Sequence, residues 1–275
     1  MSIYAKISES VVEETVLAWF ETLGYAVESG PAISPGEPRA EREEYNQVVL
    51  KGRLRRALAD INPDIPLEAI DEALRKVTRT ESPSLVENNR RFHRMLTDGV
   101  DVSYRDNGRV VHDKAWLLDL NDTENNNWLV ANQFAVVENK VNRRPDIIVF
   151  VNGLPLAVIE LKNPADEKAT IHQAYNQFQT YKGDIPTLFG YNELLIISDG
   201  LEARMGTLTS GWDRFIPWRT VDGKQIAPKG SIELEVLLKG VFDKRRFLDL
   251  ILNFVVFEDG GAAIMKKVAA YHQFH

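Results

Sequence analysis

The chain has 275 residues, of which 44% are hydrophobic and 27% are charged, and its formal net charge is −7. These values are typical of a folded globular protein, and the negative charge argues against a protein that simply coats nucleic acid. The absence of cysteine excludes disulfides, thiolate zinc sites and a cysteine nucleophile. No apolar run approaches the roughly 18 residues of a membrane span and no signal peptide is visible, so we expect a cytoplasmic protein without a membrane anchor.

The first expected element is an amphipathic helix at residues 8–23. Val12, Val16 and Phe20 recur at helical spacing, and Gly24 follows as a helix terminator. A glutamate, Glu13, lies on the same face as these apolar residues. Glutamate on such a face is unusual unless it is paired or binds a metal ion.

The next segment, residues 29–47, is rich in proline, glycine and charge and predicts an exposed loop. Short alternating segments between residues 99 and 137 predict strands separated by turns, and "ELLIISDG" at 193–200 predicts a buried strand. Further helices are expected at residues 48–59, 67–78, 84–97, 169–181 and 245–257.

Residues 143–164, "RRPDIIVFVNGLPLAVIELKNP", predict two apolar strands joined by an Asn-Gly pair. Asp146 stands where the first strand begins, and Glu160 and Lys162 end the second strand. Because side chains alternate along a strand, Glu160 and Lys162 share one face, and Leu161 points to the other. The charges therefore gather at one end of an otherwise apolar hairpin.

The length of the connection decides whether Asp146 joins that face. A two-residue turn at Asn152 and Gly153 sets Asp146 opposite Ile159, whereas a three-residue connection or a bulge at Gly153 sets it opposite Glu160. We expect the odd-length connection, because two converging carboxylates form a site for a divalent cation. Mg²⁺ accepts one or two carboxylates and takes its remaining contacts from water and phosphate.

Lys162 makes this site informative about chemistry. An ammonium beside a metal ion and two carboxylates can hold the attacking water or stabilise charge on phosphorus. Pro-Asp followed by Glu-x-Lys resembles the signature of the PD-(D/E)xK nuclease superfamily. The alternative is a solvated sheet edge with charged ends, since acid-x-Lys also occurs at 138–140, 166–168 and 222–224.

The helix that follows the hairpin carries Gln177 and Tyr181, four residues apart and hence on one face. We expect this face to lie over the site and to present an amide and a phenol to a phosphate. The alternative is that Tyr181 packs inward and Gln177 faces water.

Several stretches together resemble one family: the restriction (motor and endonuclease) subunit of type I restriction-modification enzymes. They are the hairpin above and "SESVVEETVLAWFETLGY", "AYNQFQTYK", "IPTLFGYNELLIISDG", "GTLTSGWDRFIPW" and "KKVAAYHQFH", in the family's order. The resemblance implies an α/β, restriction endonuclease-like fold with a mixed β-sheet core flanked by helices. It implies a nuclease domain at residues 1–255, with a helical insertion around 38–97, and at 256–275 the start of a linker to a helicase motor.

The resemblance also implies roles for single residues. Those implied in metal binding are Asp146, Glu160, Glu13 and the carbonyl of Leu161. Those implied in catalysis are Asp146, Glu160, Lys162 and the Gln-x-x-x-Tyr pair Gln177 and Tyr181. The residues expected to contact DNA, because they flank the site, are Arg143, Arg144 and Lys182, with "KGRLRR" at 51–56 as the alternative.

The implied function is Mg²⁺-dependent hydrolysis of foreign double-stranded DNA, as the endonuclease domain of an R subunit that assembles with methyltransferase (modification) and specificity subunits. ATP is expected only for the full-length subunit, because no Gly-x-x-x-x-Gly-Lys-Ser/Thr loop occurs in these 275 residues. Two alternatives stay open: a docking or DNA-binding module of the same complex that does not cleave, and a related repair-type nuclease.

Overall fold

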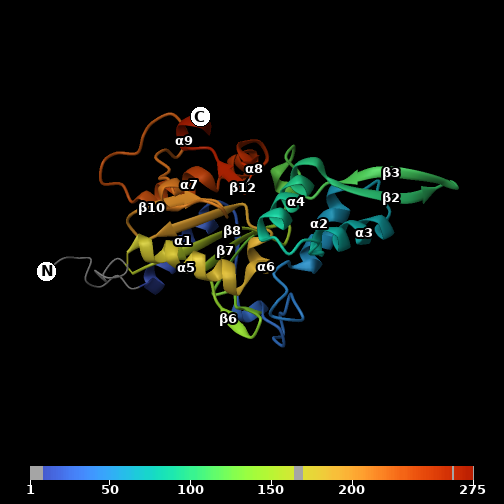
Figure 1. Cartoon of the computed structure of the whole chain (residues 1–275), viewed down its shortest axis with the longest axis horizontal. Helices are drawn as coiled ribbons and strands as arrows, with labels where there is room; N and C mark the ends of the chain where they lie inside the picture. Colours follow the sequence, from blue (N-terminus) through green and yellow to red (C-terminus); the bar gives the residue numbers. More distant parts are fainter. Residues whose placement is uncertain (1–8, 164–169, 262, 275) are drawn as a thin grey trace.

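A central mixed sheet organises the computed structural model, which describes residues 9–163, 170–261 and 263–274 (Figure 1). Its six strands run in the order β1-β4-β7-β8-β9-β10. They are β1 (Ala26–Ser29), β4 (Trp128–Asn132), β7 (Ile147–Val151), β8 (Leu154–Leu161), β9 (Leu194–Ser198) and β10 (Ala203–Gly206). The pairs β1–β4 and β8–β9 are parallel and the other neighbours are antiparallel, which confirms the expected mixed sheet.

Helices cover both faces of this sheet. As a result, every residue of the central strands β7 and β8 is buried. The helices of the described residues are α1 (Glu9–Thr22), α2 (Lys51–Ile61), α3 (Leu67–Thr78), α4 (Leu85–Asp98), α5 (Ile171–Asp184), α6 (Pro186–Phe189), α7 (Glu233–Val241), α8 (Lys244–Phe254) and α9 (Tyr271–Phe274). None of them is long and apolar enough to cross a membrane. The expected α/β fold with a helix-flanked mixed sheet is confirmed.

The helices α2, α3 and α4 lie in and next to the segment 38–97, where a helical insertion was expected, and they lead into a hairpin that projects from the body (Figure 1). Its strands are β2 (Val100–Asp106) and β3 (Arg109–Ala115). The remaining short strands are β5 (Val136–Glu138), β6 (Val141–Arg143), β11 (Val255–Asp259) and β12 (Ile264–Val268). The helix expected at 245–257 was too long, because the chain becomes strand at Val255, where two valines in succession favour β structure.

The segment 29–47 is largely the exposed loop that its composition predicts, but a few of its residues are buried and anchor it. Ile33 is fully buried, and the side chain of Arg42 is buried with its guanidinium 3.6 Å from the ring centroid of Phe134. Arg42 also donates to the carbonyl of Ala135 at 2.6 Å. Burial lowers the pKa of Arg42 to about 10. A cation–π contact and carbonyl acceptors thus allow a charged residue to hold this loop against the sheet.

The connection between β7 and β8 differs from the predicted one. The turn has two residues, Asn152 and Gly153, with φ values of 54° and 78°, so the odd-length connection was wrong. The register changes further along, because Phe150 pairs with Pro155 whereas Val149 pairs with Ala157. Proline has no N–H to donate to the ladder, and strands accommodate it at bulges.

The turn is held from both sides. The buried side chain of Asn152 accepts from the Asn127 N–H at 2.7 Å and donates to the Leu117 carbonyl at 2.9 Å. Gly153 accepts from the Leu50 N–H at 2.9 Å, where α2 begins. The hairpin and the helical insertion are therefore joined at this point.

Replacing Gly153 with alanine is expected to lower the free energy of unfolding by about 1–3 kcal/mol. A Cβ there would lie 2.5 Å from the Leu50 carbonyl oxygen, and φ is already left-handed. Gly108→Ala is the matched control, since Gly108 also has a left-handed φ but no atom within 4 Å of its added Cβ. Urea denaturation would contradict this account if both variants lost the same stability.

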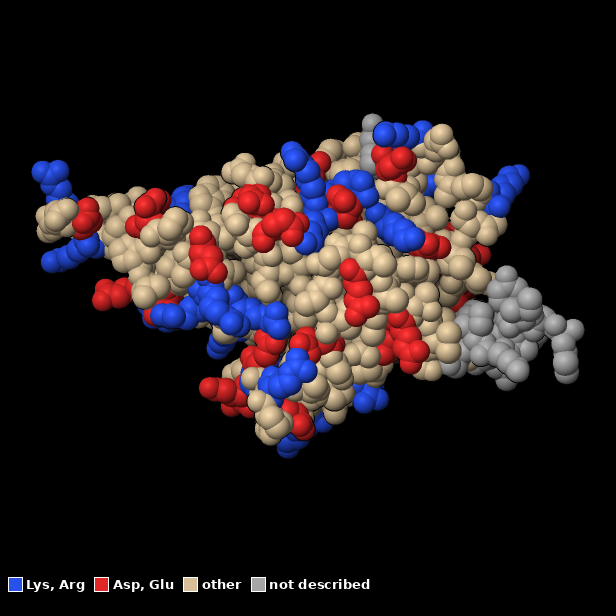
Figure 2. Space-filling model, turned by 180° about the vertical axis from the view of Figure 1, so that it is seen from behind, with Lys and Arg blue, Asp and Glu red and all other residues tan. Residues whose placement is uncertain are grey.

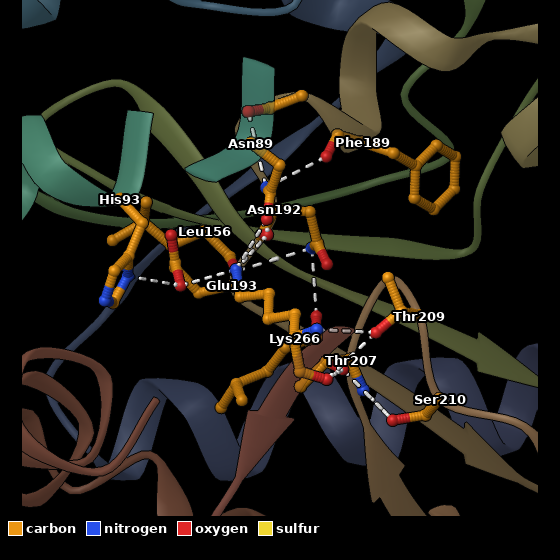
Figure 3. A network of polar contacts seen from close by, with 12 residues as sticks. Asn89, His93, Leu156, Phe189, Asn192, Glu193, Thr207, Thr209, Ser210 and Lys266 are labelled. Atoms are coloured by element: carbon orange, nitrogen blue, oxygen red, sulfur yellow. Dashed lines mark hydrogen bonds and ion pairs between the residues drawn. The ribbon is translucent and has the colours of Figure 1, made fainter. Parts of the chain in front are cut away.

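A buried polar network fixes the C-terminal hairpin to the body (Figure 3). Lys266 of β12 is fully buried and pairs with Glu193 at 2.6 Å, and it donates to Asn89 of α4 and to the carbonyl of Asn192 at 2.9 Å each. His93 of α4 lies 3.1 Å from the same glutamate oxygen. The domain boundary expected after residue 255 thus falls at the start of a hairpin whose second strand reaches into the fold.

Candidate active site

Asp146 and Glu160 lie side by side at one end of the β7–β8 hairpin. Ile147 pairs with Ile159, so Asp146, the preceding residue, comes opposite Glu160. The N–H of Leu161 donates to Asp146 Oδ2 at 2.7 Å and fixes that carboxylate. The bulge in β8 therefore produces the pairing that the sequence analysis assigned to the turn.

The two carboxyl groups are in electrostatic conflict. Glu160 is fully buried, and burial together with the charge of Asp146 raises its pKa well above the usual value. Burial raises the pKa of Asp146 to about 6, although the Leu161 N–H and Lys162 act to lower it. Glu160 Oε2 is buried and has no hydrogen-bond partner. Buried acceptors are normally satisfied, so this oxygen marks a place for a ligand.

Lys162 is the positive charge of the site. Its Nζ lies 2.8 Å from Glu160 Oε1 and 3.0 Å from the carbonyl oxygen of Leu161. Its own N–H donates to Ser198 of β9, which holds the end of β8 in the sheet. The ammonium thus lies next to Glu160 Oε1 and the carbonyl oxygen of Leu161. Together with the carboxylate of Asp146, these oxygens could bind a cation.

Helix α5 places Gln177 and Tyr181 together, as the spacing predicted. Gln177 Nε2 donates to Tyr181 Oη at 2.5 Å. Tyr181 is buried, and burial and the charge of Glu160 raise its pKa above the usual value, so the phenol stays protonated. Tyr181 therefore packs inward, as the alternative predicted. It also lies close enough to Glu160 for the charge of that carboxylate to raise the pKa of the phenol.

Glu13 of α1 is half-buried and accepts two amide hydrogen bonds, from Asn132 and Gln133 at 2.6 Å each. Gln133 has a left-handed φ of 52°, and its backbone N–H donates to the Asp146 carbonyl at 2.9 Å. The charge of Glu13 acts to raise the pKa of Asp146. Among the described residues no three His, Asp or Glu side chains gather closely enough to hold a metal ion. Glu13 thus holds the segment that touches Asp146.

Asn132 and Gln133 were missed by the sequence analysis. Both carry amide side chains, Asn132 as the last residue of β4 and Gln133 directly after it, and nothing in their spacing to Glu13 along the chain connects them. Their role depends on α1 and β4 lying next to one another, which is a tertiary contact.

The expected DNA-contacting residues differ in their surroundings. Arg143 is paired with Asp184 of α5 at 2.6 Å, and Arg144 is exposed. Lys182 lies partly buried beside Gln179, at 3.3 Å, and burial lowers its pKa to about 8. These residues flank the site through β6 and α5, and Arg144 is the most accessible of the three.

The alternative basic segment, "KGRLRR", lies on α2 at the turn end of the hairpin. Two of its four positive charges are paired, Arg53 with Glu41 at 2.5 Å and Arg55 with Asp71 at 2.6 Å. Figure 2 shows basic and acidic residues interspersed over the face behind the view of Figure 1, with no continuous basic surface. Position and pairing both favour the flanks of the site over α2.

Replacing Asp146 with asparagine is expected to stabilise the metal-free protein at pH 8 by about 1–3 kcal/mol. The folded pKa of about 6 exceeds the ordinary value of 3.8, so the free energy of unfolding falls as pH rises between these values. Asparagine cannot ionise and escapes this loss. Urea denaturation in EDTA at pH 5 and pH 8 measures it, with exposed Asp213→Asn as control. A gain that is no larger at pH 8 would contradict the conflict of charges.

Known proteins resemble the chain over nearly its whole length. A family model described as "Type I restriction enzyme R protein N terminus" matches residues 6–214. The Type I restriction enzyme HindI endonuclease subunit of Haemophilus influenzae is 40% identical over 98% of this chain. A Methanocaldococcus jannaschii protein, named for a type I restriction enzyme MjaIXP endonuclease subunit, is 33% identical over 98% of it.

The chain spans only 26% and 27% of the length of these two relatives. The similarity nevertheless covers every element of the central sheet, including β7, which Asp146 directly precedes, and β8, which carries Glu160. The family expected from the sequence is therefore confirmed: this chain belongs to the family of type I restriction enzyme R protein N termini.

Proposed function

We propose that this chain is the Mg²⁺-dependent endonuclease domain of a type I restriction enzyme R subunit and hydrolyses phosphodiester bonds of double-stranded DNA. One observation carries the proposal: Glu160 Oε2 is buried without a partner, next to the carboxylate of Asp146 and the ammonium of Lys162. The relatives named above are called endonuclease subunits, which supports the same reaction class.

The donor set fits a hard divalent cation. Two carboxylates with raised pKa values and an adjacent carbonyl, that of Leu161, offer the oxygen ligands that Mg²⁺ prefers. Asp146, Glu160 and the Leu161 carbonyl would hold the ion, which when bound supplies charge neutralisation at the phosphate and a more acidic water. The same charge would relieve the conflict between the two buried carboxyl groups.

The remaining residues of the site orient the reacting groups and hold the metal-binding residues in place. Lys162, released from Glu160 and Leu161, orients the attacking water or stabilises charge at phosphorus. Tyr181, whose phenol stays neutral, donates a hydrogen bond to the phosphate. Gln177 holds this phenol in place through the hydrogen bond between the two side chains. Glu13 acts through Gln133, which it holds against Asp146.

DNA reaches the site along its flanks in this proposal. Arg144 contacts the phosphate backbone directly, while Arg143 is positioned by Asp184 and Lys182 lies further along α5. The partners are double-stranded DNA and the modification and specificity subunits of the parent complex. ATP would serve only the remainder of the R subunit, outside this chain.

Nicking of supercoiled plasmid tests the proposal. The chain is incubated with plasmid in Mg²⁺, in Mn²⁺ and in EDTA, beside Glu160→Gln and the control Glu68→Gln, an exposed glutamate in the first turn of α3. We expect nicking that requires the cation and is lost only in Glu160→Gln. Cation binding without nicking in any variant would instead favour a docking module that does not cleave.

A further inference from the structure

A cluster of aromatic rings and one arginine lies beside the candidate site without a part in it. Trp212 begins the 3-10 helix η4 (Trp212–Arg214) and contacts His172 and Tyr175 of α5, with ring centroids 4.7 Å and 5.6 Å away. The guanidinium of Arg204, on β10, lies over the Trp212 ring at 4.8 Å. Three segments distant in sequence thus meet at one surface.

The register of the sheet connects this cluster to the site. Glu160 of β8 pairs with Ile197 of β9, and Ile197 pairs with Arg204 of β10. Residues directly opposite one another on neighbouring strands point to the same face, so Glu160 and Arg204 share a face. Two strand spacings separate them by about 10 Å. Arg204 therefore lies on the face that carries Glu160, with the buried Ile197 between them.

Only the inner half of the cluster belongs to the core. Phe215 is 2% exposed and meets Tyr175 edge to face at 5.4 Å, and Gly206 is required there because a Cβ would lie 2.8 Å from the Phe215 ring. These contacts fill the space between β10 and α5. They account for the packing without the outer residues.

The outer half faces solvent. His172 is exposed, Trp212 is half-buried, and the side chain of Arg204 is 32% exposed. The nearest oxygen of Glu202 lies 4.0 Å from the Arg204 guanidinium, which is too far for a hydrogen bond. His172 Nδ1 lies 3.1 Å from the side-chain amide nitrogen of Asn176 on the same helix.

This combination fits one class of ligand. Proteins that hold unpaired nucleic acid place aromatic rings under the bases and positive groups beside the backbone. Paired bases do not offer their faces, because they are stacked within the duplex. A guanidinium over an indole ring, with an exposed imidazole next to it, supplies both kinds of contact.

We infer that His172, Trp212 and Arg204 form a platform that holds an unpaired stretch of the DNA strand next to the scissile phosphate. The inference rests on the proposed function, because the platform includes Arg204, on the face of the sheet that carries Glu160. Trp212 stacks on a base exposed by local strand separation, and Arg204 contacts its phosphate. The platform thereby makes the site prefer DNA whose strands have already been opened.

Binding of labelled DNA to the whole chain tests the platform, with EDTA present to prevent cleavage. Fluorescence anisotropy compares a single-stranded oligonucleotide with a blunt duplex of the same sequence. We expect Trp212→Ala to weaken single-strand binding about 10-fold or more, and Trp212→Phe to retain most of it. Trp116→Ala is the control, because Trp116 is also an exposed tryptophan, 45% accessible, outside the platform.

The arginine is tested by salt. Arg204→Gln is expected to reduce the slope of log K against log salt by about 0.7, the value for one lost phosphate contact on a single strand. Single-strand binding unchanged in Trp212→Ala and Arg204→Gln, with both variants folded by circular dichroism, would overturn the platform. Equal losses on the duplex would overturn its preference for unpaired DNA.

Failure of the platform and failure of the proposed function are separable. Glu160→Gln is expected to bind the oligonucleotide normally in EDTA and to lose nicking. If the platform variants bind and nick normally while Glu160→Gln does not nick, the platform is wrong and the nuclease proposal stands. If no variant and no cation affects nicking, the nuclease proposal is wrong, and the anisotropy data still decide whether the platform binds DNA.

Discussion

Replacing Lys162 with methionine is expected to reduce cation-dependent DNA cleavage by a factor of about 10²–10³. Methionine keeps the length and the apolar stem of lysine and removes the ammonium, which lies 2.8 Å from Glu160 Oε1. A donor aimed at charge that develops in the transition state is worth most when it is preorganised and shielded from water. The Lys162 side chain is only 13% exposed, so the ammonium is shielded from water.

The matched control is Lys224→Met, at an exposed position remote from the hairpin. Plasmid nicking rates at saturating Mn²⁺ measure the effect. Lys162 also acts to lower the pKa values of Asp146 and Glu160, so its loss is expected to shift the rising limb of the pH profile to higher pH. A variant that cleaves within a few-fold of the parent, with an unshifted profile, would remove Lys162 from the proposed chemistry.

Replacing Lys266 with methionine is expected to lower the free energy of unfolding by about 3–5 kcal/mol. The change leaves Glu193 fully buried without its cation, and Glu193 Oε1 already lacks a partner. Burial acts to raise the pKa of Glu193, but Lys266 and His93 more than offset it and keep the pKa below the usual value. The pair therefore stabilises the fold above the usual glutamate pKa, and that stability is lost as pH falls through the lower folded value.

The next residue offers the matched control, because Lys267 lies on the same strand but is exposed and pairs with Glu258 at the surface. Lys267→Met is expected to change stability by less than about 1 kcal/mol. The double variant Lys266→Met with Glu193→Gln should recover part of the loss, since it no longer buries an unpaired charge. Urea denaturation measures all three, and equal effects at 266 and 267 would contradict the account.

The sequence predicted those elements whose signal is local. Residues 67–78 form a helix as expected because apolar residues repeat at helical spacing and Pro66 precedes the first turn. The helix expected from residue 48 begins instead at Lys51, because Leu50 is held by the hairpin turn. That hydrogen bond joins residues about a hundred positions apart, and no sequence pattern in either segment predicts it.

In the β7–β8 hairpin the predicted pairing of Asp146 with Glu160 was correct, but the predicted cause, an odd-length connection, was wrong. The requirement that Asp146 meet Glu160 followed from alternation and chemistry, and the structure meets it. Asn-Gly is a strong signal for a two-residue turn, and it formed one. Pro155, inside an apolar strand, was the available sign that the register would change after the turn instead.

Burial of charged residues was the least predictable feature. Lys266 lies between Met265 and Lys267, so its segment reads as a solvated strand, yet Lys266 is the member that points inward. Arg42 lies in a segment whose composition predicted exposure. In both cases the partners, Glu193 and Phe134, come from other parts of the chain, and only the tertiary structure brings them together.

The central claim is that Asp146 and Glu160 hold a divalent cation, and calorimetric titration of Mn²⁺ tests it most directly. The chain, Glu160→Ala and Asp146→Ala are titrated at pH 8 with and without DNA, beside Glu68→Ala, an exposed glutamate of α3, as the control. The account predicts binding by the chain and the control and its loss in both site variants. Binding that persists in both site variants, or no binding by the chain even with DNA present, would contradict it.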